Sequence, residues 1–168
     1  SDGSPMTWCR SDACRSCRAA PRVGVPGALR SSRCPQRPVT TLAIDGLGGV
    51  HRTAAAIAGN WQLVAGALSS TPEKAKASGA ELGLPDDRNY GSWTEMLERE
   101  AALPADVRIQ AVSIVTPNHM HAPPAVAAME AGFDVLCDKP LCLSVAEAID
   151  LYETVEHTGR LFCLTHNY

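Results

Sequence analysis

The sequence lacks any long hydrophobic run. None of its 168 residues lies in a stretch of about 18 apolar residues, which is the length that a membrane-spanning helix needs. No positively charged segment leads into an apolar signal core either, so we expect a cytoplasmic protein with no membrane partner. Aromatic residues make up only 5% of the chain, but 45% of it is hydrophobic. At this length, that content is enough for one domain with a buried core.

Lysine is absent from the first 38 residues, and these differ in composition from the rest. They hold seven Arg and two Asp, a net charge of +5, whereas residues 39–168 carry a net charge of −8. We therefore divide the chain into an irregular Arg- and Cys-rich arm, residues 1–38, and a second domain, residues 39–168.

The arm shows no clear helical or strand periodicity. Cys9, Cys14 and Cys17 match one iron–sulfur spacing, but Cys34 stands too far on and no His is near, so we expect no metal. The Arg content leaves open a nucleic-acid-binding arm or an organellar targeting segment. The composition also fits a gene read partly out of frame. We favour a disordered tail and expect no nucleic-acid partner.

From residue 39 onward, β-rich runs alternate with helical patterns. Strands are expected over 39–44, 62–68, 111–115, 134–137 and 161–165, and helices over 50–58, from 70, from 92, over 123–131 and over 144–158. Strands buried on both faces that alternate with amphipathic helices indicate parallel βαβ units. Right-handed crossovers then give a doubly wound sheet. The predicted fold class is α/β with a Rossmann-type parallel sheet.

Local signals support individual elements of this pattern. Ser92 with Glu95, and Ser144 with Glu147, have the spacing of capping boxes at helix starts. Cysteines in or beside apolar segments are expected to be reduced core residues; these are Cys137, Cys142 and Cys163.

A glycine-containing turn, residues 45–49, follows the first strand and opens a helix. Gly46 and Gly48 fit the first two positions of the G-x-G-x-x-G fingerprint, but His51 stands at the third. Glycines let the backbone approach a pyrophosphate, which the helix N-terminus attracts. We expect Gly46, Gly48 and Gly49 to bind a dinucleotide; an ordinary strand-to-helix turn is the alternative.

No acidic residue follows the second strand, where a carboxylate would bind the ribose hydroxyls of NAD. Ser69 and Ser70 stand there, with Lys74 one turn later. Hydroxyls and a cation suit a 2′-phosphate, so the sequence favours NADP over NAD. A simple helix-capping role for Ser70 or Thr71 is the alternative.

Two more polar segments follow the third and fourth strands, whose carboxyl ends form the ligand edge of such sheets. The first segment runs from Thr116 to His121, and Pro117 fixes its exit from the strand. Asn118, His119 and His121 could bond a ribose or substrate hydroxyl, although a capping or surface role is the alternative for either histidine. The second contains Asp138 and Lys139. A lysine held there can donate to a substrate oxygen and steady charge during hydride transfer, although most lysines are simply solvated.

Together these segments resemble the Gfo/Idh/MocA family, the relatives of glucose–fructose oxidoreductase and inositol dehydrogenase. The similarity covers residues 39–168 and rests on the stretches 46–52, 116–121 and 137–140, with Asp-Lys-Pro where the family usually has Glu-Lys-Pro. It implies an N-terminal Rossmann domain that binds NAD or NADP and a sugar or polyol substrate. It also implies that Lys139 touches both cofactor and substrate, and that Pro117, Asn118 and His121 line the cofactor.

The sequence stops at Tyr168, where the family's substrate-binding domain should begin. We therefore expect a fragment or truncated chain with little activity alone, and we leave a homo-oligomer open. The alternatives are a non-catalytic nucleotide-binding module, or a metal- or nucleic-acid-binding arm on an inert Rossmann remnant.

Overall fold

The structure, a computed structural model, describes residues 39–44 and 48–166. Of residues 39–44 it describes the backbone only. The interpretations of the Arg- and Cys-rich arm, of its cysteines and of Gly46 therefore concern residues outside the described ranges.

The described residues form a five-stranded sheet in which every pairing is parallel. The strands are β1 (Val39–Ile44), β2 (Trp61–Gly66), β3 (Ala111–Ile114), β4 (Asp134–Asp138) and β5 (Phe162–Thr165), in the order β2-β1-β3-β4-β5. A further parallel bridge joins Gly66 to Asn89 beyond β2. This confirms the predicted α/β class and doubly wound parallel sheet.

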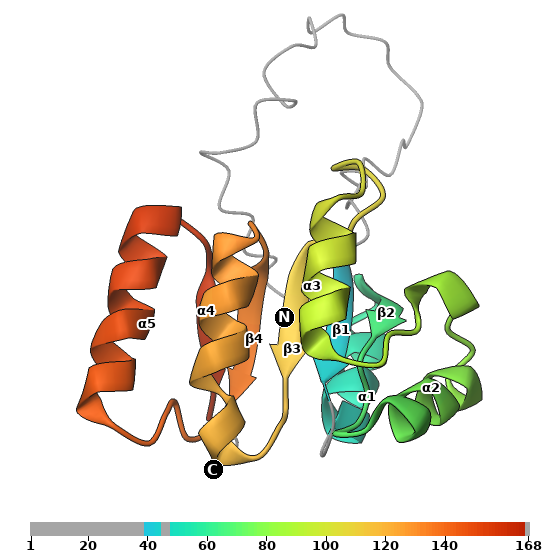
Figure 1. The fold of residues 1–168 in the computed structure, drawn as a ribbon, viewed down its shortest axis with the longest axis horizontal. Coiled ribbons are helices and arrows are strands. Elements are labelled where there is room, and N and C mark those ends of the chain that lie inside the picture. The colour runs from blue at the N-terminus through green and yellow to red at the C-terminus, as the bar shows by residue number, and fades with distance from the viewer. Residues whose placement is uncertain (1–38, 45–47, 167–168) are drawn as a thin grey trace, which may run out of the picture. The chain divides into compact units, whose positions relative to one another are not determined.

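Helices cover the two faces of the sheet unequally. They are α1 (Gly48–Ala58), α2 (Pro72–Glu81), α3 (Trp93–Ala101), α4 (Ala122–Glu130) and α5 (Val145–Thr158), with 3-10 turns η2 (Asp86–Arg88) and η3 (Asn118–Met120). The connection from β1 to β2 runs the opposite way along the sheet to the later connections, so right-handed crossovers put α1 on one face and α3, α4 and α5 on the other. Figure 1 shows α3 and α4 in front of the sheet, and α4 packs against both α3 and α5.

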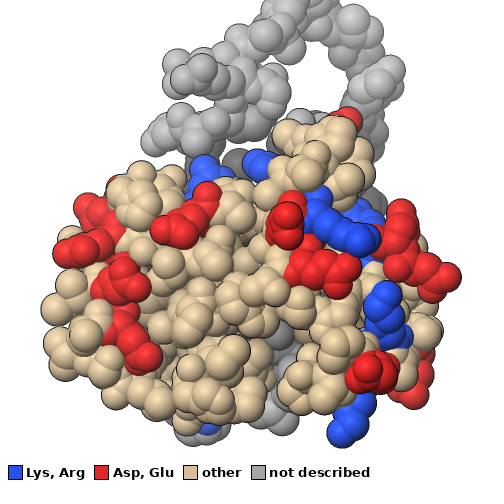
Figure 2. All heavy atoms as spheres, viewed as in Figure 1, with Lys and Arg blue, Asp and Glu red and all other residues tan. Residues whose placement is uncertain are grey.

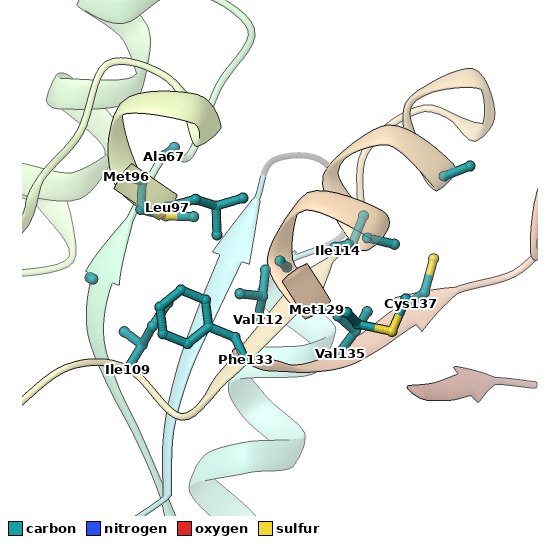
Figure 3. Close-up of a cluster of buried hydrophobic side chains, with 14 of the residues drawn as sticks. Ala67, Met96, Leu97, Ile109, Val112, Ile114, Met129, Phe133, Val135 and Cys137 are labelled. Atoms are coloured by element: carbon teal, nitrogen blue, oxygen red, sulfur yellow. The ribbon is translucent and has the colours of Figure 1, made fainter. Parts of the chain in front are cut away.

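The main core lies between the sheet and helices α3 to α5, as Figure 3 shows. Val112 and Ile114 of β3, with Val135 and Cys137 of β4, alternate toward this face and are almost fully buried. Phe133, just before β4, has no exposed surface. All four residues of β3 are buried, as expected for a central parallel strand covered on both faces.

Most predicted elements are confirmed, with shifted ends. Helix α1 begins at Gly48, two residues before the predicted start, and β2 ends at Gly66. The Ser144 box is complete, whereas at α3 the Glu95 carboxylate accepts from Gly91 instead of from the cap residue. The prediction of a core position for Cys163 is wrong: its side chain is exposed. Among the described helices, none combines the length and apolarity needed to cross a bilayer.

A buried carboxylate, not predicted from the sequence, joins η2, α3 and the start of β3. Glu100 is fully buried and accepts from Arg88 Nε at 2.9 Å, the Tyr90 hydroxyl at 2.9 Å and the Ile109 amide at 3.0 Å. Its second oxygen also forms an ion pair with Arg88 Nη2. A carboxylate is stable away from water only when it is paired and hydrogen-bonded in this way.

This cluster gives a testable dependence of stability on alkaline pH. Burial, together with the hydrogen bond to Glu100, raises the pKa of Tyr90 to about 12. The unfolded chain ionises this phenol near pH 10. The contribution of protonated Tyr90 to the free energy of unfolding is therefore fully present below about pH 10. It is lost progressively as the pH rises to about 12. Urea unfolding across this range should show a smaller decline for Tyr90→Phe than for the unmodified chain; equal declines would contradict the assignment.

Candidate functional site

Three segments of the predicted site leave the same edge of the sheet. The start of α1 follows β1, the turn 116–121 follows β3, and residues 138–140 follow β4. Because β1, β3 and β4 are neighbouring parallel strands, their carboxyl ends share one edge. The connections also change direction between β1 and β3, which is where ligands of doubly wound sheets bind.

The start of α1 suits an anionic group. Gly48 is the first helical residue and is buried, and no acidic residue stands in the first turn to repel an anion. Among the described residues, a Cβ at Gly49 would meet only Arg52 Nη2, at 3.7 Å. These features fit the pyrophosphate of NAD or NADP, which needs backbone donors at a helix N-terminus.

His51, at the third position of the glycine fingerprint, lies against the sheet. Its Nδ1 is 2.7 Å from Ser113 Oγ of β3. The third glycine of the fingerprint normally permits close helix–strand packing. Here a side chain stands at that position and a hydrogen bond links α1 to β3. The departure from glycine at residue 51 is visible in the sequence, but the partner is not.

The turn after β3 is held together by internal hydrogen bonds. Thr116 Oγ1 donates to the Met120 carbonyl at 2.8 Å, while Pro117 and Asn118 are exposed at the edge. The exposed residues are therefore accessible to a ligand, and Thr116 shapes the turn that presents them.

His121 lies beneath this turn and does not face solvent. The ring is almost fully buried, with Nε2 2.9 Å from the Thr116 carbonyl and Nδ1 2.6 Å from the Pro140 carbonyl. Each ring nitrogen thus lies within hydrogen-bond distance of a backbone carbonyl, one from each of the two segments. His121 thus ties the turn after β3 to the segment after β4, which is a role that the sequence did not predict.

Asp138 and Lys139 form the third segment. The Asp138 carboxylate accepts from the Lys139 amide at 2.9 Å and from Thr165 Oγ1 at 3.0 Å. Burial acts to raise the pKa of Asp138, but these hydrogen bonds and the electrostatic interactions with His51 and Lys139 outweigh it and hold the pKa below its usual value. Asp138 is therefore ionised at neutral pH. The Lys139 side chain is half-buried, and the Lys139–Pro140 peptide bond is cis.

In the sheet, β1 stands between β2 and β3. The segment after β2 therefore lies on the opposite side of the glycine turn from the segment after β3. Ser69 is half-buried, while Ser70 and Lys74 are exposed. The cap residue of α2 is Thr71, and its side chain makes no capping hydrogen bond. Thr71 is thus the cap residue that the alternative named, by its position and not through a side-chain hydrogen bond.

A hollow of about 300 Å³ runs along α1 on the face away from α3 to α5. Thr165 lines it at the carboxyl end of β5, the paired residues Ser113 and Leu136 line its middle beside His51, and Trp61 lines it at the amino end of β2. Within ranges 39–44 and 48–166, no three His, Cys, Asp or Glu side chains come together to hold a metal ion.

Comparison with known proteins places these observations in a family context. A family model described as "Oxidoreductase family, NAD-binding Rossmann fold" matches residues 41–166. An oxidoreductase from Sinorhizobium meliloti has a similar crystal structure, with 47% identity and a TM-score of 0.73 over 77% of this chain and 37% of that one. An inositol dehydrogenase homolog from Azotobacter vinelandii, crystallised with NADH and myo-inositol, gives 36% identity and a TM-score of 0.72 over 77% of this chain and 35% of its own.

Among curated proteins, levoglucosan dehydrogenase of Pseudarthrobacter phenanthrenivorans is 30% identical over 99 residues, which are 59% of this chain and 23% of that protein. The chain spans about a quarter of the length of the curated relatives that it matches.

Proposed function

Because the chain belongs to the Gfo/Idh/MocA oxidoreductase family and its matched residues form the NAD-binding Rossmann fold, we propose that it is the cofactor-binding domain of a sugar or polyol dehydrogenase. The observation that carries this proposal is the shared edge at which the segments after β1, β3 and β4 end. A bound nicotinamide would supply the hydride acceptor or donor.

The residues at the edge divide into groups that would bind different parts of the cofactor. The backbone at Gly46, Gly48 and Gly49 would hold the pyrophosphate. Pro117 and Asn118, which are exposed, would line the cofactor further along the edge, with Thr116 and His121 fixing their turn.

Lys139 is the proposed catalytic residue. Its ammonium group would donate to a substrate hydroxyl oxygen and steady the charge that changes there during hydride transfer. Asp138 would act as a positioning residue, because its ionised carboxylate accepts the Lys139 amide and the Thr165 hydroxyl and so fixes the backbone that carries the lysine.

The substrate class follows from the relatives. Their names include levoglucosan dehydrogenase and D-xylose 1-dehydrogenase (NADP(+)), and a solved homolog holds myo-inositol. All three compounds are polyhydroxylated, so we propose a sugar or polyol for this protein too. Its cytoplasmic location and its assembly with further copies stay predictions.

Turnover by the 168-residue chain alone should be negligible. Hydride transfer needs the reacting carbon held against the ring in a cleft that excludes water, with a base for the hydroxyl proton. The described edge supplies one side of such a cleft. Sugar-dependent reduction of NADP⁺ should therefore be undetectable although NADP⁺ binds. If the chain binds NADP⁺ but stays inactive after fusion to the substrate domain of a relative, that result would support the alternative of a non-catalytic nucleotide-binding module.

We also predict that NADP⁺ binds more tightly than NAD⁺. The positive charge of Lys74 beside Ser69 and Ser70 attracts the 2′-phosphate, and no carboxylate stands there for the ribose hydroxyls of NAD⁺. Lys74→Ala should weaken NADP⁺ binding by about two- to fivefold, the range of one exposed charge pair, and leave NAD⁺ binding unchanged. Calorimetric titrations test this, with the exposed Lys76→Ala on the same helix as the control; tighter NAD⁺ binding in the unmodified chain would refute the preference.

A further inference from the structure

A second hollow, with a polar lining, lies at the edge of the sheet where the strands begin, opposite the proposed cofactor edge. It has a volume of about 420 Å³, and its lining includes Arg108, Glu130, Gly132, His157 and Arg160. These residues come from the ends of α4 and α5 and from the loops before β3 and β5. In Figure 2, basic side chains lie near the upper margin of the molecule, which is the side of the amino ends of β3 and β4 in Figure 1.

Two guanidinium groups converge on Gly132 in this hollow. Arg160 Nη1 donates to the Gly132 carbonyl at 3.3 Å. Arg108 Nη2 and Nη1 lie 3.7 Å and 3.9 Å from the point where a Cβ on Gly132 would stand. Gly132 has a φ of +87°, which residues with a side chain rarely adopt, so no Cβ stands between its backbone and the Arg108 guanidinium.

The Phe133 ring also orients Arg108. Its guanidinium carbon stands 5.4 Å from the centre of the Phe133 ring, and that ring is fully buried. Stacking on an aromatic face restricts the guanidinium plane and keeps its edge N–H groups available to a ligand.

Neither arginine is neutralised by a carboxylate within the part of the chain that the structure describes. The ion pairs there involve Arg88 and Arg99 only. Glu130 lines the hollow but forms no ion pair with either group at 4.0 Å or less.

The nearby helix ends do not require the arginines as caps. The carbonyl groups of Ala127, Ala128 and Met129 already accept backbone amides at the end of α4, and the Val155 carbonyl accepts the Gly159 amide at the end of α5. Among the residues that the structure describes, the Gly132 carbonyl is the one hydrogen-bond acceptor that either guanidinium group reaches. His157 Nδ1 bonds to the Glu153 carbonyl, which leaves Nε2 as another polar atom of the lining.

We propose that this hollow binds a phosphate group, either as free phosphate or carried by a small molecule, between Arg108 and Arg160. Guanidinium groups match phosphate oxygens with paired, charge-assisted hydrogen bonds, and two of them around one open point suit a tetrahedral dianion. The site is distinct from the cofactor edge, because it lies at the other end of the same parallel strands. Phosphate bound there would stabilise the folded chain.

The test is calorimetric and thermal titration of the chain with sodium phosphate at constant ionic strength set by sodium chloride. We expect saturable binding and a rise in Tm, with the phosphate affinity at least about tenfold lower in Arg108→Gln and in Arg160→Gln, since each variant loses charge-assisted hydrogen bonds. Arg99→Gln, an exposed arginine on α3, should leave the affinity unchanged. The Tm of each variant in sodium chloride alone shows whether it is folded. The two arginines are replaced in separate variants, so that if one variant fails to fold, the other still tests the site.

Glycerol 3-phosphate, titrated in parallel, distinguishes the two sources of the group. Tighter binding of the ester identifies a phosphorylated small molecule as the ligand, and tighter binding of inorganic phosphate identifies the free ion. Phosphate binding that is unchanged in both arginine variants would place the anion elsewhere, such as at the start of α1, and would overturn the proposal. Absence of saturable binding would overturn it as well.

Discussion

Replacing Glu100 by alanine is expected to lower the free energy of unfolding by about 3–5 kcal/mol, the cost of removing one partner from a buried ion pair. The change leaves the Arg88 guanidinium, the Tyr90 hydroxyl and the Ile109 amide without their common acceptor. It also removes the link between η2, α3 and the start of β3. Equilibrium urea unfolding measures the loss directly.

Glu98→Ala is the matched control for this variant. Glu98 lies on the same helix but is exposed, so its replacement should change the stability by no more than about 0.5 kcal/mol. A loss below about 1 kcal/mol for Glu100→Ala would mean that the buried carboxylate contributes little, and that the packing of Met96 and Leu97 alone holds α3 in place.

Replacing Lys139 by alanine is expected to reduce kcat by at least about 100-fold, the lower range for losing a positioned proton-handling group. Because the 168-residue chain alone should turn over little, the measurement needs a chimera. Residues 41–166 would replace the matching part of the Azotobacter vinelandii inositol dehydrogenase homolog, a structure of 36% identity that holds NADH and myo-inositol. The assay follows myo-inositol-dependent reduction of NADP⁺, the cofactor that residues 41–166 are predicted to prefer.

The reference for this experiment is the unmodified chimera, and Lys76→Ala serves as the control because that lysine is exposed on α2. The kcat of the Lys76→Ala chimera should equal that of the unmodified chimera. A decrease of less than about threefold for Lys139→Ala would show that the lysine is a solvated surface group. An effect confined to KM would assign it to binding alone.

The alternation of strand and helix could be predicted because each element carries its own local signal. The apolar run 111–115 and the Ser144 capping box depend only on neighbouring residues, and both are confirmed. The ends of elements shift by one or two residues, because hydrogen bonding at the termini depends on tertiary neighbours.

The site was predictable as a set of strand ends, but not as a set of contacts. His121 was expected to line a cofactor, yet its two ring nitrogens lie within hydrogen-bond distance of backbone carbonyls from two different segments. Glu100 stands in a helical pattern that gives no sign of its partners, because Arg88 and Tyr90 reach it only after folding. A sequence pattern shows which face is apolar, but it does not show which charged groups meet inside.

Backbone amide chemical-shift mapping of the chain during titration with NADP⁺ tests the location of the cofactor most directly. We expect saturable shifts at Gly48, Asn118 and Lys139, the residues that follow β1, β3 and β4 at the carboxyl edge. Residues of the opposite edge, Arg108 and Arg160, should shift much less. Shifts concentrated at that opposite edge, or no saturable shifts at all, would contradict the assignment of the carboxyl edge as the dinucleotide site.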